Sequence, residues 1–229
     1  MNDAVYTLER DGRVWFRNAL NNAEIETLIK ANLSNKAHGM RINWNTKQAA
    51  ILRSVSSLHD LASRVVPGAK PVRALMFNKS PKANWVVPWH QDRVVAVKHK
   101  HEVRSYYNWT KKTGVWHVEP PLHILEKMVF ARIHLDDNTQ ENGCMEIALG
   151  SHKHGYISSE TIPECVAALP NEICEAKRGD VLIVKALTLH RSGASKSGAL
   201  RRVLRVDYSN QDLAMPLQWA VLGQRKPLP

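Results

Sequence analysis

An apolar run over residues 85–89 ends in a histidine and a carboxylate that are two residues apart, His90 and Asp92. In an extended strand, residues i and i+2 point to the same face, so these two side chains can reach one point. A third ligand for a metal ion there must come from elsewhere, and the best candidate is His190, which follows the β-rich run 181–184. The chain therefore needs a fold in which strands about a hundred residues apart meet at one end.

The ordered set of these residues favours a non-haem iron site. Two imidazoles and one carboxylate on one face of an octahedron leave three positions open, as in Fe(II) oxygenases. Arg201 follows His190 after eleven residues, and its planar guanidinium suits two-pronged binding of a carboxylate. A lone His-x-Asp triplet is weak evidence because chance matches are frequent. The order His-x-Asp, histidine after a strand, then arginine on the next strand strengthens it.

Four stretches of the sequence occur together in a known order: Met76-Phe77-Asn78-Lys79, Trp89-His90-Gln91-Asp92, the block 142–153, and His190-Arg191-Ser192-Gly193 up to Arg201. Over about residues 70–210 they resemble the phytanoyl-CoA dioxygenase (PhyH-like) family. The resemblance implies a double-stranded β-helix, also called a jelly roll or cupin-like fold. It also implies Fe(II), 2-oxoglutarate and O₂ as cofactors and co-substrates, with His90, Asp92 and His190 as catalytic iron ligands.

The same resemblance assigns four positions to 2-oxoglutarate binding. Arg201 and Ser192 match the residues that hold its far carboxylate, and Leu75 matches a residue beside it. Arg132 matches a contact position where family members can carry an aromatic residue, so it is open whether Arg132 meets a substrate or a co-substrate carboxylate. Arg202 faces the other side of the same strand, and a one-residue slip in register would exchange it with Arg201.

Residues 93–127 are the least regular and most chemically mixed segment of the sequence. The segment is too long for a hairpin loop, and long loops in compact domains often form lids or binding loops. We predict a lid, since the family varies here with substrate, and the alternative is a surface excursion whose aromatic residues pack into a small core of their own. The candidate substrate-binding residues are Tyr107, Trp109, Trp116 and His117.

Apolar residues recur at helical spacing over residues 25–33 and about 46–65, whereas strand patterns dominate residues 72–208. We predict a single domain over residues 1–229, with a helical buttress at 1–70 and a jelly-roll core at 71–210. The fold class is therefore mainly β with flanking helices, built as two facing antiparallel sheets.

Bulk properties exclude several classes of protein. No window approaches about 18 uninterrupted apolar residues, so no membrane span is expected. The N-terminus has no basic segment followed by an apolar one, and three cysteines do not suggest a disulfide framework, so we predict a cytoplasmic protein. The net charge of +11 is spread along the chain without a basic run, and no nucleic-acid partner is expected.

We predict a dioxygenase that uses Fe(II) and 2-oxoglutarate to hydroxylate a small organic substrate, with release of succinate and CO₂. The basic residues weakly favour an anionic substrate. Asp92 favours a hydroxylase over a halogenase, because related halogenases carry a non-carboxylate residue there. Three alternatives stay open: a cupin-like metal enzyme that does not use 2-oxoglutarate, an oxygenase acting on nucleic acid, and a non-catalytic binding module.

Overall fold

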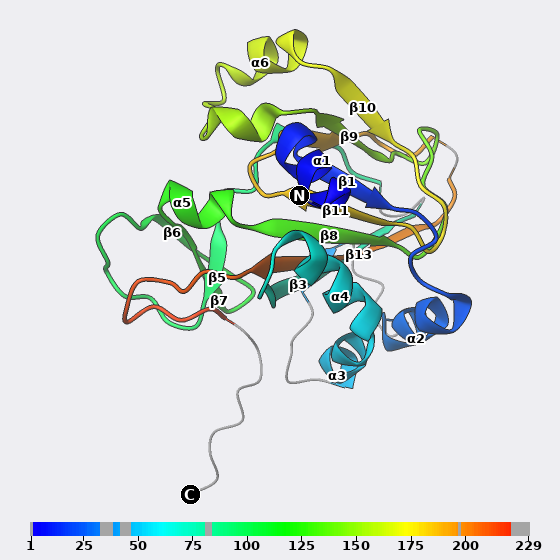
Figure 1. Cartoon of the computed structure of the whole chain (residues 1–229), viewed down its shortest axis with the longest axis horizontal. Coiled ribbons are helices and arrows are strands. Elements are labelled where there is room, and N and C mark those ends of the chain that lie inside the picture. The colour runs from blue at the N-terminus through cyan, green and yellow to red at the C-terminus, as the bar shows by residue number, and fades with distance from the viewer. Residues whose placement is uncertain (1, 33–38, 42–46, 81–83, 197, 221–229) are drawn as a thin grey trace, which may run out of the picture.

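The computed structural model describes residues 2–32, 39–41, 47–80, 84–196 and 198–220, and its largest element is a six-stranded antiparallel sheet (Figure 1). The strands run in the order β1 (Arg13–Phe16), β11 (Val181–Lys185), β8 (Val129–His134), β13 (Arg201–Ser209), β3 (Lys70–Lys79) and β2 (Gly39–Arg41). The strands predicted from the sequence near residues 72, 126, 181 and 200 all lie in this large sheet.

A smaller sheet faces the large one. Its four strands are β10 (Asn171–Cys174), β9 (Met145–Ala148), β12 (His190–Ser192) and β4 (Val87–His90), in that order. Apolar side chains fill the space between the sheets, among them Phe130 and Leu182 from the large sheet and Ile147 from the small one. Two facing antiparallel sheets confirm the predicted mainly β, jelly-roll architecture, and this pairing places β12 beside β4.

Four helices cover the other face of the large sheet (Figure 1): α1 (Asp3–Asp11), α2 (Asn22–Asn32), α3 (Lys47–Ser54) and α4 (Ser56–Val65). Side chains of β8 alternate, so that Ala131 and Ile133 pack with the helices while Arg132 points toward the small sheet. The helix predicted over residues 46–65 is two helices separated at Val55. Residues 1–70 also supply the two edge strands β1 and β2.

Gly12 lies between α1 and β1 in the chain, and it also contacts the segment that precedes β12. It ends α1 with a φ of +79°, a conformation that favours glycine. A Cβ atom at this position would lie 2.5 Å from Nδ1 of His152 and 2.5 Å from Oγ1 of Thr188. The Thr188 hydroxyl also donates a hydrogen bond to the Gly12 carbonyl, 3.0 Å away, so this close approach helps fix the segment that precedes His190.

Residues 93–127 are more regular than the sequence suggested. They form a three-stranded sheet of β5 (Val95–Val97), β7 (Val115–Glu119) and β6 (Tyr107–Lys112), followed by α5 (Leu122–Glu126). Apolar residues of this small sheet pack with Leu213 and Leu217 near the end of the described chain. The expectation of an irregular segment was wrong, because these strands have a hydrophobic cluster of their own.

The remaining elements are a 3₁₀ turn, η1 (Ser151–His154), and α6 (Ile162–Ala168), which lies next to β10 at one end of the molecule (Figure 1). None of the helices in the described part of the chain has the length and apolar character needed to cross a membrane.

Candidate metal centre

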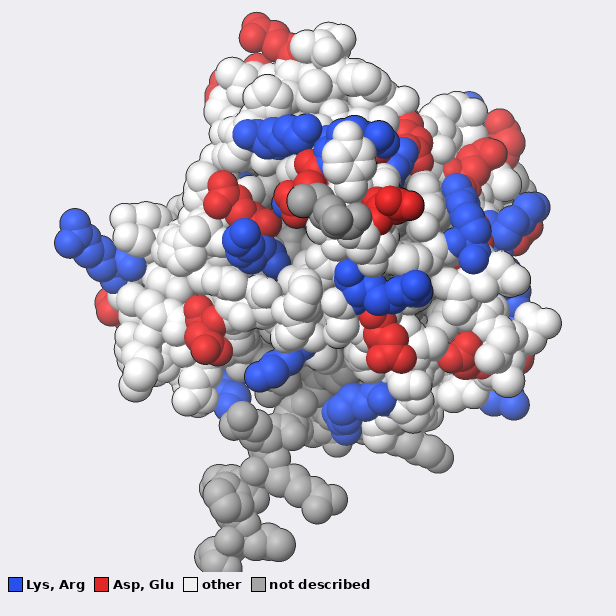
Figure 2. All heavy atoms as spheres, in the orientation of Figure 1, with Lys and Arg blue, Asp and Glu red and all other residues white. Residues whose placement is uncertain are grey.

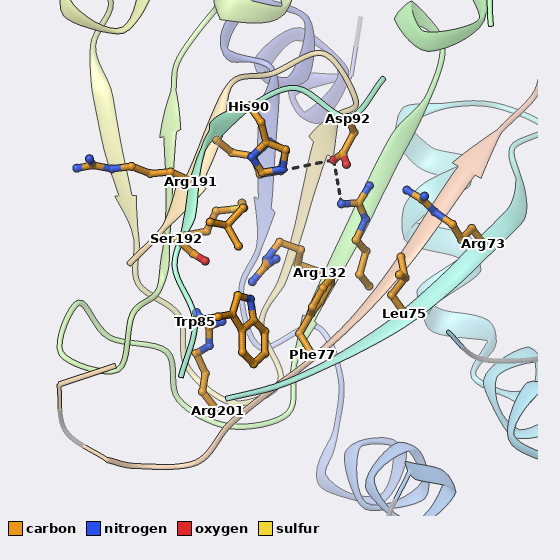
Figure 3. Close-up of a pocket in the computed structure, with 14 residues that line it drawn as sticks. Arg73, Leu75, Phe77, Trp85, His90, Asp92, Arg132, Arg191, Ser192 and Arg201 are labelled. Carbon is orange, nitrogen blue, oxygen red and sulfur yellow. Dashed lines mark ion pairs between the residues drawn. The ribbon is translucent and has the colours of Figure 1, made fainter. Parts of the chain in front are cut away.

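Three side chains converge where the small sheet opens beside the large one (Figure 3). His90 ends β4, His190 begins β12, and the two residues are paired across the strands with ring centroids 4.2 Å apart. Asp92 lies just beyond the end of β4, with its Oδ2 atom 3.5 Å from Nε2 of His190. One ligand atom from each of the three residues lies within 4.8 Å of the others. The structure therefore brings together the three residues that the sequence predicted.

The route by which Asp92 reaches this point differs from the prediction, because the strand ends at His90. Gln91 is buried between the two candidate ligands and points away from them. Its side-chain amide donates hydrogen bonds to the carbonyls of Gly155 and Leu187, at 2.8 and 2.7 Å. The Asp92 N–H donates to the carbonyl of Ala186, 3.1 Å away. These backbone anchors, rather than a continuous strand, set the direction of Asp92.

Both imidazoles are held by the backbone carbonyl two residues before them. Nδ1 of His90 lies 2.8 Å from the Pro88 carbonyl oxygen, and Nδ1 of His190 lies 2.9 Å from that of Thr188. A carbonyl oxygen only accepts, so each Nδ1 must carry the proton. In a neutral ring with this tautomer, Nε2 carries the free lone pair, which is the usual arrangement of a metal-binding histidine.

The carboxylate of Asp92 has an oxygen that suits a metal ion. Oδ2 is buried and has no hydrogen-bond partner among the described residues. Its nearest cation is Arg205, whose Nη1 lies 2.9 Å away in an ion pair that is not aligned as a hydrogen bond. Buried polar atoms are normally satisfied, so an unsatisfied oxygen facing two imidazole nitrogens fits a divalent metal with nitrogen and oxygen ligands.

The protonation states also fit a metal. Burial raises the pKa of Asp92, but Arg205, His190, Arg73 and His90 together lower it by more, so its pKa lies well below the ordinary value. Burial lowers the pKa of His190 to about 3, and the nearby charges of His90 and Arg205 act in the same direction. The carboxylate is therefore ionised and His190 neutral near pH 7, the forms that metal ligands require.

A cavity of about 190 Å³ opens beside these three residues (Figure 3). Its apolar walls come from Leu75, Phe77, Trp85, Val87 and Met145, and its polar lining includes Ser192 and the arginines Arg73, Arg132, Arg191, Arg201 and Arg205. Asp92 is the only carboxylate among the described residues that line it. The cavity is thus strongly cationic, and three of the residues predicted for 2-oxoglutarate binding besides Arg201 line it: Leu75, Arg132 and Ser192.

Arg201 lies at the opposite end of the cavity from His90 and Asp92 (Figure 3). Its side chain is buried, and its guanidinium donates a hydrogen bond to the Gly143 carbonyl. Burial lowers its pKa to about 10. Arg202, the neighbour that a register slip would exchange with Arg201, instead forms an ion pair with Asp136 at 2.6 Å. The strand register therefore directs Arg201, and not Arg202, toward the cavity.

Two further buried cations accompany Arg201. Lys79 lies directly opposite it on β3, is fully buried, and donates a hydrogen bond to the Gly193 carbonyl. Burial, followed by the charge of Arg201 and of Arg205, lowers the pKa of Arg132 to about 9. The Nε of Arg132 is buried and has no hydrogen-bond partner within the described part of the chain. No carboxylate among the described residues forms an ion pair with any of the three. Lys79, Arg132 and Arg201 form a three-cation cluster, and their buried charges lower the stability of the folded protein unless an anion binds there.

The four residues predicted to bind substrate do not line this cavity. Tyr107 is exposed on β6, whereas His117 is fully buried. Trp109 and Trp116 meet edge to face at 6.3 Å and pack on the hydrophobic cluster of the three-stranded sheet. Their part in substrate binding stays a prediction, and the aromatic residues that do line the cavity, Phe77 and Trp85, were not selected from the sequence.

Arg73 and Arg205 were not predicted to line the site, because single arginines outside any motif are common in a sequence with a net charge of +11. The alternation of β13 could have found Arg205, which lies four residues after Arg201 and therefore shares its face.

Comparison with known proteins gives a consistent result. The family model described as phytanoyl-CoA dioxygenase (PhyH) matches residues 8–203, a range that contains all three candidate ligands and Arg201. The search of curated proteins found no match.

Many solved structures share the fold. AviO1 from Streptomyces viridochromogenes Tue57 has a TM-score of 0.68 and 20% sequence identity, covering 93% of this chain and 96% of that one. EctD from S. alaskensis, with 2-oxoglutarate and 5-hydroxyectoine, has a TM-score of 0.70 and 15% identity, covering 100% and 85%. The epimerase SnoN, in complex with Fe³⁺, alpha ketoglutarate and nogalamycin RO, has a TM-score of 0.66 and 17% identity, covering 91% and 82%. At these identities the likeness shows a common fold.

Proposed function

Because the chain belongs to the phytanoyl-CoA dioxygenase family of Fe(II)- and 2-oxoglutarate-dependent oxygenases, we propose that it hydroxylates a small organic substrate at the centre formed by His90, Asp92 and His190. The observation that carries this proposal is the convergence of two imidazoles, each with its Nδ1 bound to a backbone carbonyl, and one ionised carboxylate at the mouth of a cationic cavity. Two Nε2 atoms and one Asp92 oxygen would hold Fe(II) and leave positions open for the co-substrate and O₂.

The far carboxylate of 2-oxoglutarate would bind to Arg201 and Ser192. Arg132 lines the same cavity and has an unsatisfied buried nitrogen, which supports a role as a second cationic partner of that carboxylate. Leu75 supplies an apolar wall. The three-cation cluster has no ion-pair partner among the described residues, which favours an enzyme that binds an anion such as a dicarboxylate over a cupin-like enzyme that does not.

When bound, Fe(II) with 2-oxoglutarate and O₂ supplies an oxidative decarboxylation to succinate and CO₂, coupled to conversion of a substrate C–H bond to an alcohol. The chain itself supplies placement. His90 and His190 are fixed by their Nδ1–H bonds to carbonyl oxygens, which leaves Nε2 of each ring available to the metal. The ligand atoms of the three residues lie within 4.8 Å of one another. The apolar walls, including Phe77 and Trp85, exclude water from the reacting atoms.

The cavity favours a small substrate, because a volume of about 190 Å³ is small for a ligand site. Its arginines do not by themselves indicate a charged substrate, since Arg73, Arg191 and Arg205 are paired with carboxylates and we assign the other two to 2-oxoglutarate. EctD and SnoN were crystallised with small organic molecules, 5-hydroxyectoine and nogalamycin RO. On the face seen in Figure 2, Lys and Arg side chains are interspersed with Asp and Glu, so this face offers no continuous basic track for nucleic acid.

The proposal is tested by anaerobic titration with Fe(II) and then 2-oxoglutarate. A chelated keto acid gives a weak visible charge-transfer band, which should appear in the wild-type protein and in Arg202→Met, and should require far more 2-oxoglutarate in Arg201→Met. The two variants are a matched pair, since the arginines are neighbours on β13 but only Arg201 faces the cavity. A screen of compounds scored by succinate release then identifies the substrate. Absence of the band at saturating Fe(II) and 2-oxoglutarate would refute the proposal.

A further inference from the structure

Arg205 reaches from the large sheet across to the loop that carries Asp92. Its side chain is only 8% exposed, and it is held on three sides. Nη1 lies 2.9 Å from Asp92, Nε donates a hydrogen bond of 2.6 Å to Asp207, and the guanidinium carbon stacks 4.0 Å from the ring centroid of Phe130. A guanidinium fixed in this way has little freedom to move aside when a metal ion binds.

The contact belongs to a chain of four alternating charges. The second oxygen of Asp207 accepts a hydrogen bond of 2.5 Å from Nε of Arg73, so the order is Arg73, Asp207, Arg205, Asp92. Two guanidinium groups thus balance two carboxylates. The negative charge of Asp92 is already matched by a cation before any metal ion arrives.

We propose that Arg205 is a positioning residue and a built-in counter-ion of the metal centre, which holds the Asp92 carboxylate beside His190 and lowers the affinity of the site for divalent metal ions. The inference rests on the proposed function, in that it takes His90, Asp92 and His190 as the metal ligands. Its basis is that Nη1 of Arg205 and the metal would share one carboxylate oxygen. A shared anion attracts each cation less, and the two cations repel each other.

Loss of the Arg205 charge should raise the affinity of the site for divalent metal ions. Replacing Arg205 by methionine removes the repelling charge and leaves Asp92 buried without its counter-ion, so metal binding becomes more favourable. Asp207 keeps Arg73 as its partner in that variant. Charges a few ångströms apart interact appreciably even in a protein surrounded by water, and we expect affinity to rise about tenfold, equivalent to about 1.4 kcal/mol. Asp207→Asn should act in the opposite direction, because it leaves the charge of Arg205 uncompensated on that side.

The experiment uses Mn(II), which does not oxidise under these conditions and whose free form is counted by electron paramagnetic resonance. Wild-type protein, Arg205→Met, Arg205→Lys, Asp207→Asn and the control Arg202→Met are titrated, after far-ultraviolet circular dichroism has shown that each is folded. We expect tighter binding in Arg205→Met, weaker binding in Asp207→Asn, and affinities near that of the wild type in the two other variants. General damage to the fold would instead weaken Mn(II) binding in both Arg205→Met and Asp207→Asn.

The outcomes separate this inference from the function on which it rests. If the wild-type protein binds one Mn(II) that is lost in His90→Ala, but Arg205→Met shows no gain or a loss of affinity, the role of Arg205 is refuted and the metal centre stands. If the wild-type protein binds no Mn(II) at this site, the metal centre is refuted and the role of Arg205 falls with it.

Discussion

Replacement of Arg201 by methionine should stabilise the ligand-free protein and weaken the binding of 2-oxoglutarate. Burial lowers the pKa of Arg201 from 12.5 to about 10. One pKa unit corresponds to about 1.4 kcal/mol, so the buried charge costs the folded state about 3 kcal/mol near pH 7. Methionine removes that cost but leaves the Gly143 carbonyl without its donor, which costs about 1–2 kcal/mol. The net expectation is a gain in unfolding free energy of about 1–2 kcal/mol.

The loss in binding should be larger than the gain in stability. A charge-assisted, two-pronged contact between a guanidinium and a carboxylate is among the stronger polar interactions in proteins. Removing one partner from such a buried pair typically costs about 3 kcal/mol or more. We therefore expect the dissociation constant for 2-oxoglutarate to rise about a hundredfold, which corresponds to about 2.7 kcal/mol.

Two measurements and one control decide this prediction. Urea unfolding followed by tryptophan fluorescence gives the stability, and isothermal titration calorimetry with Mn(II) present gives the affinity for 2-oxoglutarate. Arg202→Met removes a partly buried, two-pronged pair with Asp136, so it should cost about 1 kcal/mol and leave co-substrate binding unchanged. Unchanged 2-oxoglutarate affinity in Arg201→Met, or a loss of stability greater than that of Arg202→Met, would contradict the assignment of Arg201.

Three further predictions test other parts of the structure. Burial, with the charges of Arg201 and Arg132, lowers the pKa of Lys79 to about 8 from 10.5. Between these values the unfolded chain binds more protons, so unfolding free energy should rise with pH from about 8 to 10.5 in urea titrations. Lys79→Met should reduce this rise without removing it, because Arg132 and Arg201, whose pKa values are lowered to about 9 and about 10, act in the same direction. Gly12→Ala should cost about 3 kcal/mol and lower the melting temperature in calorimetry, because its Cβ would meet Oγ1 of Thr188 at 2.5 Å in a left-handed conformation. Tyr107→Ala should leave 2-oxoglutarate binding by calorimetry unchanged, since Tyr107 is 63% exposed and outside the cavity; a raised KM for a substrate, once identified, would support the predicted lid.

The metal ligands could be predicted because the constraint on them is local. His90 and Asp92 are separated by one residue, and this spacing kept them close although Asp92 lies beyond the end of the strand. The third ligand, His190, came from the strand pattern before it. The spacing from His190 predicted Arg201 rather than Arg202, but this prediction depended on the register of the strand that carries both arginines. In the structure Arg201 is paired with Lys79, which fixes that register. The family membership, the enzyme class and the cofactors predicted from these residues are confirmed.

The three-stranded sheet of residues 93–127 was missed because its turn signal is weak. β6 and β7 are joined at Thr113-Gly114, where both residues have a positive φ of 50° and 82°. Such a two-residue turn is usually marked by Asn-Gly or Asp-Gly, and threonine is a poor indicator of it. Aromatic residues on either side of this turn, Trp109 and Trp116, pack against each other and give the sheet its own core.

The cation network of the cavity depends on contacts that no local pattern encodes. Arg132 lies opposite Arg205 on adjacent strands, and Lys79 lies opposite Arg201. Like charges directly opposite one another destabilise a sheet, so they need compensating anions. Asp92 and Asp207 compensate Arg205, and the dicarboxylate that we propose would compensate the other cations. The small sheet contributes the histidines and the large sheet contributes the unpaired cations, and a dianion with one end at each would join the two sheets. The same buried cations that lower the stability of the ligand-free sheet support our proposal that its inner face binds a dicarboxylate.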